Sequence, residues 1–182
     1  MKFNSLGILI SSLLFSGVSH AIDATERIND IQQFGKWYYA EFSMPTTMAY
    51  RIGVESKLPQ DKSTLFIDIS PLTQCEPGDV TVNHFIGYKQ MDLPPFLPVS
   101  YKISGQQKQD SITTPSINEG YLFSPISSLK ISDLLKSKGK GSFSFWYTPP
   151  TESKEKPQKI FFPLDGLPEA YKAAINSCKE NM

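Results

Sequence analysis

Histidine is scarce in this chain, which has only two in 182 residues. His20 lies in an N-terminal segment that we expect to be removed, so His84 is the only imidazole of the mature protein. A nucleophilic triad would have to use it, but the sequence has no Gly-x-Ser-x-Gly elbow. A metal site would have to combine it with carboxylates, because the sequence has neither an HExxH pattern nor a cysteine cluster. We therefore predict no catalytic residue, no metal and no cofactor, and interpret His84 as a strand residue satisfied by a neighbouring group.

Other catalytic patterns are missing as well. The sequence has no phosphate-binding loop or dinucleotide-binding motif, since "GKGS" (139–142) lacks the required spacing. Glu41, Glu55 and Asp68 lie in predicted strands, and paired carboxylates can hydrolyse a glycan. Nothing in the sequence indicates that any two of them converge. We therefore expect a protein that is not an enzyme and keep a hydrolase as the third of three functional hypotheses.

The chain has no excess of either charge, with 18 lysines and arginines against 18 aspartates and glutamates. Lys2 is the only charged residue among the first 21, so the mature chain would carry 17 basic and 18 acidic side chains. Such a balance gives no global field that would attract nucleic acid or an anionic membrane. We interpret the basic run 136–141 and the mixed run 151–159 as solvated loops.

Long apolar runs are also absent after the N-terminus. The run "LGILISSLLFSGV" (6–18) follows a single positive charge and is too short to span a bilayer comfortably. Ser19 and Ala21 place small residues three and one before a cleavage point, so we predict a signal peptide over residues 1–21, cleaved after Ala21. The alternative is a retained N-terminal anchor. Residues 22–182 are then a single β-rich exported domain without a membrane span, which we place in the periplasm, with secretion or surface association as alternatives.

Cysteine is limited to Cys75 and Cys178. In an exported protein two cysteines allow one intramolecular pairing, so we predict a disulfide between them. Apolar residues recur at helical spacing from Leu167 to Cys178, which puts Cys178 on the buried face of a C-terminal helix. The bond would tie this helix to the distant loop "TQCEPGD" (73–79). A redox thiol, or a thiol that pairs with another chain, is the alternative.

The remaining pattern is that of short strands separated by clusters of Pro, Gly, Asn and Asp. We predict a mainly β fold, an antiparallel β-sandwich or barrel-like domain with a C-terminal helix tied by the disulfide. A further helix is predicted near 127–139, ending at Gly139, and a possible one at 24–34. The expected strands, rich in aromatic and β-branched residues, are 36–43, 48–56, 64–70, 80–88, 98–104, 120–124, 142–148 and 159–164.

Two segments at opposite ends of the chain carry a family resemblance. "FGKW" (34–37) and the C-terminal series "ISDLLKSKGKG", "SFSFWYT", "KIFFPLDG" and "LPEAYKAAINSC" resemble the invasion-associated locus B family of exported bacterial proteins. The resemblance implies a β-rich periplasmic or surface-associated protein linked to host-cell interaction, with no assigned catalysis. Leu167 stands where the family usually has Phe, and no cysteine precedes Cys75. The closing positions of the family pattern are occupied by Pro163, Leu164, Gly166, Leu167 and Ala170.

With no catalytic, metal or cofactor pattern in the sequence, binding of a partner is the function that we consider next. The loop "MDLPPFLP" (91–98) is stiffened by three prolines and is more apolar than a solvated loop requires. The aromatic pair at 146 and 147 puts rings on both faces of one strand, of which only one can be core. The alternative for both features is ordinary packing. The candidate binding residues are Met91, Leu93, Phe96, Leu97, Trp146 and Tyr147.

Two functional hypotheses from different classes follow, and both require a protein partner. The first is an exported non-enzymatic factor of the invasion-associated type that binds an envelope or host component. The second is a periplasmic inhibitor or immunity protein that blocks a toxin or a cell-wall hydrolase. A small β domain with a protruding stiff loop suits either role, and nothing in the sequence identifies the partner.

Overall fold

The computed structural model describes residues 27–87, 92–148 and 157–182. The predicted signal peptide, its cleavage after Ala21 and the candidate residue Met91 lie outside these ranges.

The larger of two antiparallel sheets contains seven strands, and its outer strands are β1 and β8. Consecutive strands pair with each other from β1 to β5. The chain then leaves the sheet and returns as the β8–β9 hairpin, in which β9 pairs with β5 and β8 forms the outer edge. In order across the sheet, its strands are β1 (Arg27–Phe34), β2 (Trp37–Ser43), β3 (Met48–Glu55), β4 (Ser63–Ile69), β5 (Val80–Phe85), β9 (Tyr121–Ile126) and β8 (Ser116–Asn118).

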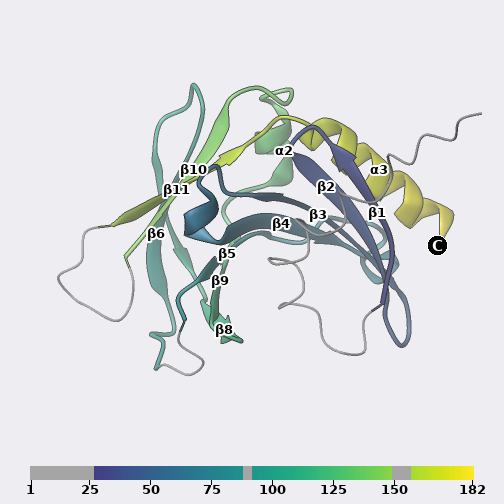
Figure 1. The fold of residues 1–182 in the computed structure, drawn as a ribbon, viewed down its shortest axis with the longest axis horizontal. Helices are drawn as coiled ribbons and strands as arrows, with labels where there is room; N and C mark the ends of the chain where they lie inside the picture. The colour runs from purple at the N-terminus through teal and green to yellow at the C-terminus, as the bar shows by residue number, and fades with distance from the viewer. Residues whose placement is uncertain (1–26, 88–91, 149–156) are drawn as a thin grey trace, which may run out of the picture.

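The smaller sheet contains four strands and lies over one part of the larger sheet, where its strands cross those of the larger sheet (Figure 1). Among the described residues, two α-helices and two 3-10 turns complete the elements: α2 (Ile131–Leu135), α3 (Leu167–Glu180), η1 (Pro59–Asp61) and η2 (Pro71–Thr73). In order across the smaller sheet, the strands are β11 (Gln158–Pro163), β10 (Ser142–Tyr147), β6 (Leu97–Ile103) and β7 (Gln109–Thr113).

One core lies between the two sheets and continues under α3. Alternation along β4 buries Leu65, Ile67 and Ile69 on the inner face of the larger sheet, as the sequence pattern predicts. The inner residues of β6, β10 and β11 pack against that face on one side, and α3 covers it at β1, β2 and β3 on the other. The mainly β architecture with a C-terminal helix is therefore confirmed.

The disulfide between Cys75 and Cys178 is present and joins residues 103 positions apart in sequence. Cys178 is fully buried on the face of α3 that also carries Leu167, Ala170 and Ala174. Cys75 lies two residues after the end of η2, in the loop between β4 and β5. The predicted pairing is confirmed, and it fastens the last helix to the larger sheet's β4–β5 connection.

The helix expected at 24–34 is wrong where the structure describes it, because Arg27–Phe34 forms strand β1. A bulge between Ile28 and Asp30 shifts the register against β2. The extra residue puts Ile28 and Ile31 on the same face, so a spacing of three residues arises in a strand and imitates a helix. Both side chains pack on a second apolar cluster around Phe42, on the outer face of the sheet.

Strands β7 and β8 were not expected, because their residues look like turn clusters. Both are short, polar and at a sheet margin, and such composition protects an outer strand from pairing with other chains. The predicted short helix near 127–139 is confirmed as α2, and Gly139 follows it with a positive φ of 73°.

The two segments that carry the family resemblance lie against each other, although they are more than 120 residues apart. Phe34–Trp37 forms the β1–β2 turn, and Pro163–Gly166 connects β11 to α3. The Lys36 N–H donates to the Asp165 carbonyl oxygen at 3.0 Å, and the Trp37 indole Nε1 donates to the Pro163 carbonyl oxygen at 2.9 Å. We call this pair of segments the N–C clasp.

Close backbone approach explains the glycine on the C-terminal side of the clasp. Gly166 has φ +90°, and a Cβ at this position would overlap the carbonyl oxygen of Phe34. Only glycine accepts both the left-handed conformation and the contact. The residues that carry the resemblance therefore have a structural role, which is to join the first hairpin to the last strand and helix.

Candidate partner-binding surface

Register determines which side chains of the smaller sheet point away from the core. Pro98 lies opposite Ile112, Ser100 opposite both Asp110 and Trp146, and Trp146 opposite Lys159. Directly paired residues share a face, so these side chains form one outer surface. We call it the small-sheet face, and its members are Pro98, Ser100, Lys102, Asp110, Ile112, Ser144, Trp146, Lys159 and Phe161.

This face is more apolar than an exposed sheet surface requires. Ile112 is 62% exposed, Pro98 is exposed, and Trp146 and Phe161 are half-buried. Several apolar side chains that reach solvent on one sheet face are a feature of interaction sites. Trp146 lies near its centre, and large aromatic side chains at such positions contribute disproportionately to binding.

Two lysines hold the Trp146 ring. The Nζ of Lys159 lies 4.7 Å from the Trp146 ring centroid and 4.2 Å from that of Phe161, and the Nζ of Lys108 lies 5.0 Å from Trp146. These cation–π contacts restrict the ring before a partner arrives. With Lys102, the described residues of this region carry three cations against the one carboxylate of Asp110, which accepts a hydrogen bond from Ser100 Oγ at 2.8 Å.

The structure separates the predicted binding residues into two groups. Leu97 and Tyr147 are 5% and 2% exposed and belong to the core, so neither can contact a partner from the surface. Strand alternation at the start of β6 and along β10 turns them inward. Leu93 is half-buried and packs on the core. Phe96 is 57% exposed, and Trp146 lies on the small-sheet face.

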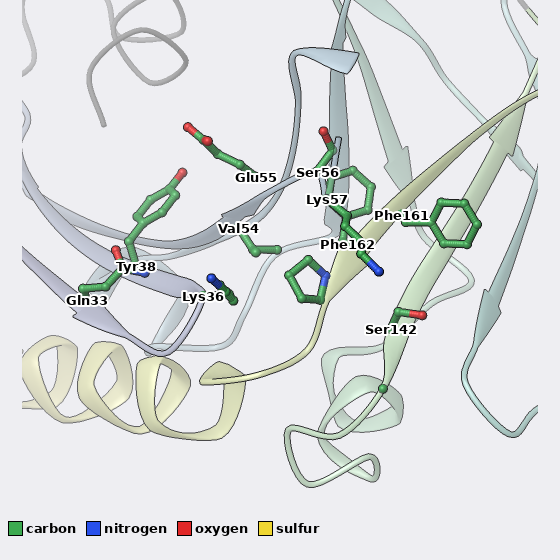
Figure 2. A pocket seen from close by; sticks show the side chains of 12 residues that line it. Gln33, Lys36, Tyr38, Val54, Glu55, Ser56, Lys57, Ser142, Phe161 and Phe162 are labelled. Carbon is green, nitrogen blue, oxygen red and sulfur yellow. The ribbon is translucent and has the colours of Figure 1, made fainter. Parts of the chain in front are cut away.

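A pocket of about 640 Å³ adjoins this face where the free side of β11 meets the larger sheet (Figure 2). We call it the edge pocket, and sequence reasoning missed it because it gathers residues from four separate segments of the chain, 33–38, 54–57, 141–142 and 161–163. Its lining residues are Gln33, Lys36, Tyr38, Val54, Glu55, Ser56, Lys57, Gly141, Ser142, Phe161, Phe162 and Pro163. Phe161 belongs to both surfaces, so the pocket and the small-sheet face are continuous.

The N–C clasp builds one wall of the edge pocket, since Lys36 and Pro163 belong to it. Tyr38, from the outer face of β2, lies across Gly53 of β3, whose missing side chain leaves room for the phenol. Burial raises the pKa of Tyr38 to about 12, against a partial lowering by the nearby Arg51 guanidinium. Tyr38 is therefore a neutral hydroxyl at any physiological pH.

Charge in the edge pocket is mostly positive. Lys36 and Lys57 are exposed, and Figure 2 shows them on two sides of the pocket. Neither ammonium lies within salt-bridge distance of a carboxylate among the described residues, where ion pairs join Arg51 to Asp68 and Lys136 to Asp133.

His84 lies in β5, and its Nδ1 is 2.6 Å from the Ser63 hydroxyl of β4. The prediction of a strand histidine satisfied by a neighbour is confirmed. Desolvation lowers the pKa of His84 to about 4, although a hydrogen bond to the Asp61 backbone acts in the opposite direction. The imidazole is therefore neutral and packs against the Tyr147 ring of the other sheet, with centroids 5.2 Å apart.

Ser63 and His84 form a serine–histidine pair of the kind that can act as a nucleophile and its base. Their separation in sequence gave no sign of this contact. Ser63 is 2% exposed, and its hydroxyl donates to the Asp61 carbonyl oxygen at 2.9 Å. A nucleophile needs access to substrate and a hydrogen bond directed to its base. This geometry instead fastens β4 to β5 at the rim of the core.

The three strand carboxylates do not meet. Glu41 lies on the inner face of the larger sheet, where it accepts a hydrogen bond from Tyr39 Oη at 3.0 Å. Asp68 lies on the outer face and pairs with Arg51 at 2.6 Å. Glu55 follows Arg51 by four strand positions, or about 13 Å. Among the described residues, no group of three His, Cys, Asp or Glu side chains is arranged to hold a metal ion.

A membrane-spanning helix is not found in the described part of the chain, where no helix combines sufficient length with sufficient apolar character.

Comparisons with solved structures show a likeness of fold. The crystal structure of invasion associated protein B from Bartonella henselae is similar to this chain with a TM-score of 0.59 and 11% sequence identity. The match covers 85% of this chain and 100% of that one. No family model and no curated protein matches the sequence. The likeness at this identity shows a shared fold.

Proposed function

We propose that this chain is an exported, non-enzymatic bacterial protein of the invasion-associated type, which binds an envelope or host protein through the small-sheet face. The observation that carries the proposal is the ordered Trp146, held between Lys108 and Lys159 on a surface with Ile112 exposed. The fold shared with invasion associated protein B supports the same type. The disulfide fits an oxidising compartment outside the cytoplasm.

The partner that fits this face is a protein surface with an acidic rim and an apolar centre. Ile112, Trp146 and Phe161 supply the apolar contacts, and the lysines around them favour carboxylates. An aromatic centre within a charged rim is the usual distribution of binding free energy in a protein interface.

A second candidate, an inhibitor or immunity protein against a toxin or cell-wall hydrolase, is favoured by the loop before β6. Phe96 is 57% exposed and directly follows two exposed prolines, Pro94 and Pro95. A stiff loop that presents an aromatic side chain loses little conformational entropy when it enters a concave site on a partner. An enzyme as the partner would support this second candidate.

Site-specific photocrosslinking tests both candidates. A photoreactive phenylalanine analogue is introduced at Ile112 or at Phe96, and a control analogue replaces the exposed Lys172 of α3. The protein is irradiated in the cells that produce it and in contact with host cells, and adducts are identified by mass spectrometry. We expect the same protein adduct from Ile112 in repeated experiments and none from Lys172.

The Trp146→Ala variant supplies the second half of the test. Loss of an aromatic anchor weakens an interface by about 1 to 3 kcal/mol, so the Ile112 adduct should fall by about fivefold or more. Adducts that form equally at Lys172, or that are unchanged by Trp146→Ala, would contradict binding through the small-sheet face. An adduct confined to Phe96, with an enzyme as the captured protein, would replace the first candidate by the second.

A further inference from the structure

The free side of β11 exposes backbone hydrogen-bonding groups. Alternate residues of an antiparallel strand direct N–H and C=O toward the neighbouring strand, and the residues between them direct these groups away. The Phe161 carbonyl accepts from the Lys57 N–H at 2.7 Å, across the floor of the edge pocket. Phe161 therefore belongs to the outward set, and so does Lys159 two positions earlier.

This leaves a short ladder at the margin of the smaller sheet. The N–H and C=O of Lys159 and the N–H of Phe161 point toward the space beside β11. Beyond Phe161 the ladder ends, because Lys57 and the Trp37 indole already occupy the carbonyls of Phe161 and Pro163. Such a margin accepts one added strand of limited length.

The side chains around this margin favour a negatively charged occupant. Lys36 and Lys57 stand on two sides of the edge pocket without a carboxylate partner among the described residues, and Lys159 projects from the strand itself. Glu55 is the one acid among the described residues of the lining. Between the lysines the accessible apolar surface of the pocket comes from the half-buried Phe161 and Pro163, since Val54 and Phe162 are buried in the core.

We propose that the edge pocket receives an extended segment of a protein partner, which pairs with β11 and places a carboxylate side chain between Lys36 and Lys57. The volume of about 640 Å³ is in the range that holds a few side chains. This inference rests on the proposed function, since the segment belongs to the partner that covers the adjoining small-sheet face. Backbone pairing supplies affinity, and the lysines select for acidic segments.

Selection of short random peptides displayed on phage tests the inference without knowledge of the partner. The full mature chain is the bait, and a chosen peptide is then synthesised and its affinity measured by fluorescence anisotropy. We expect the selected peptides to be enriched in Asp or Glu and in β-branched residues. Replacement of the acidic residues by Asn or Gln should weaken binding about tenfold, as loss of a charge-assisted contact predicts.

Matched variants localise the peptide. Lys36→Gln with Lys57→Gln should weaken binding about tenfold, whereas Lys172→Gln with Lys179→Gln on α3 makes the same charge change and should leave it unaltered. Lys159→Pro removes an outward N–H without loss of a bond to β10, so it should abolish binding while Lys159→Gln retains most of it. Circular dichroism confirms that each variant is folded.

The outcomes separate this inference from the proposed function. Selected peptides without acidic enrichment, or with equal affinity for the Lys36 and Lys57 double variant, would overturn the edge pocket as an acceptor. If Trp146→Ala loses peptide binding and the Lys36 and Lys57 double variant does not, the edge pocket is not the peptide site, and binding through the small-sheet face is supported. A peptide that needs both lysines, together with absence of any partner adduct at Ile112, would uphold the pocket and contradict the proposed function.

Discussion

Gly166→Ala should be among the most destabilising single-methyl substitutions in this chain. Two costs combine at the position. An L-residue with φ +90° pays about 1 to 2 kcal/mol for the left-handed backbone. The new Cβ would also overlap the Phe34 carbonyl oxygen, so the N–C clasp has to open and lose hydrogen bonds worth about 1 kcal/mol each from Lys36 and Trp37. We expect a loss of about 3 to 4 kcal/mol in the free energy of unfolding.

Gly105→Ala is the matched control. Gly105 has φ +82°, close to the φ of Gly166, but nothing lies within 4 Å of the Cβ that would be added. It pays the conformational cost alone, about 1 to 2 kcal/mol. The difference between the two variants therefore measures the close approach at the clasp.

Urea unfolding followed by tryptophan fluorescence measures both variants. Trp37 is fully buried and donates to Pro163, so its emission reports on the clasp directly. The midpoint should fall further for Gly166→Ala at an unchanged slope. If Gly166→Ala fails to fold, Trp37→Phe replaces it and its unfolding is followed by circular dichroism, because the Trp37 fluorescence is gone; this variant removes one donor and should cost about 1 to 3 kcal/mol. Equal stability of the two alanine variants, or a Trp37→Phe protein as stable as the wild type, would refute the reasoning.

Three further predictions concern the disulfide, the buried imidazole and the proline loop. Replacement of Cys75 and Cys178 by alanine should lower stability by up to about 4.7 kcal/mol, the chain-entropy value for a loop of this length, and intact mass of the native protein should show no free thiol. Retention of the wild-type melting temperature would contradict it. The folded pKa of His84, about 4, lies below its unfolded value of 6.5, so its contribution of up to about 3 kcal/mol is present above pH 6.5 and is lost as the pH falls toward 4. The melting temperature of His84→Gln should therefore fall less between pH 6.5 and pH 4 than that of the wild type. Equal falls in the two proteins would show that His84 is not the cause. Phe96→Ala should change stability by less than about 1 kcal/mol because the ring is 57% exposed, whereas partner binding should weaken by about 1 to 3 kcal/mol; a strongly destabilised variant that binds normally would remove the loop as a contact site.

Local pattern was sufficient for most strands of this fold. Alternation in β4 identifies its buried side chains, because a two-residue period needs no knowledge of the neighbours. The same reasoning failed at β1, where the bulge between Ile28 and Asp30 replaces the strand period by a three-residue spacing. Strands β7 and β8 could not be found from composition, since edge strands are selected for polar residues rather than for β propensity.

The candidate surface depends on information that sequence does not contain. The neighbouring aromatic residues Trp146 and Tyr147 predict that one ring points away from the core, but only the packing of β10 shows that it is Trp146. The edge pocket is formed by four segments at the place where two sheets meet. Its two lysines, Lys36 and Lys57, have no periodic relation in sequence, so no local pattern could have joined them.

The clasp and the edge pocket use the same residue in different ways. Lys36 holds the clasp with its backbone N–H and faces the pocket with its side chain. Pro163 likewise accepts from Trp37 through its carbonyl while its ring lines the pocket. The contacts that fix the wall therefore belong to the main chain and to Gly166, whose role no other residue can take. Because the side chains of Lys36 and Pro163 take no part in these contacts, their substitution would alter the charge and shape of the pocket without opening the clasp. A sequence motif such as Phe34–Trp37 then identifies the scaffold, and the specificity for a partner has to be sought in the lysines and aromatic residues beside it.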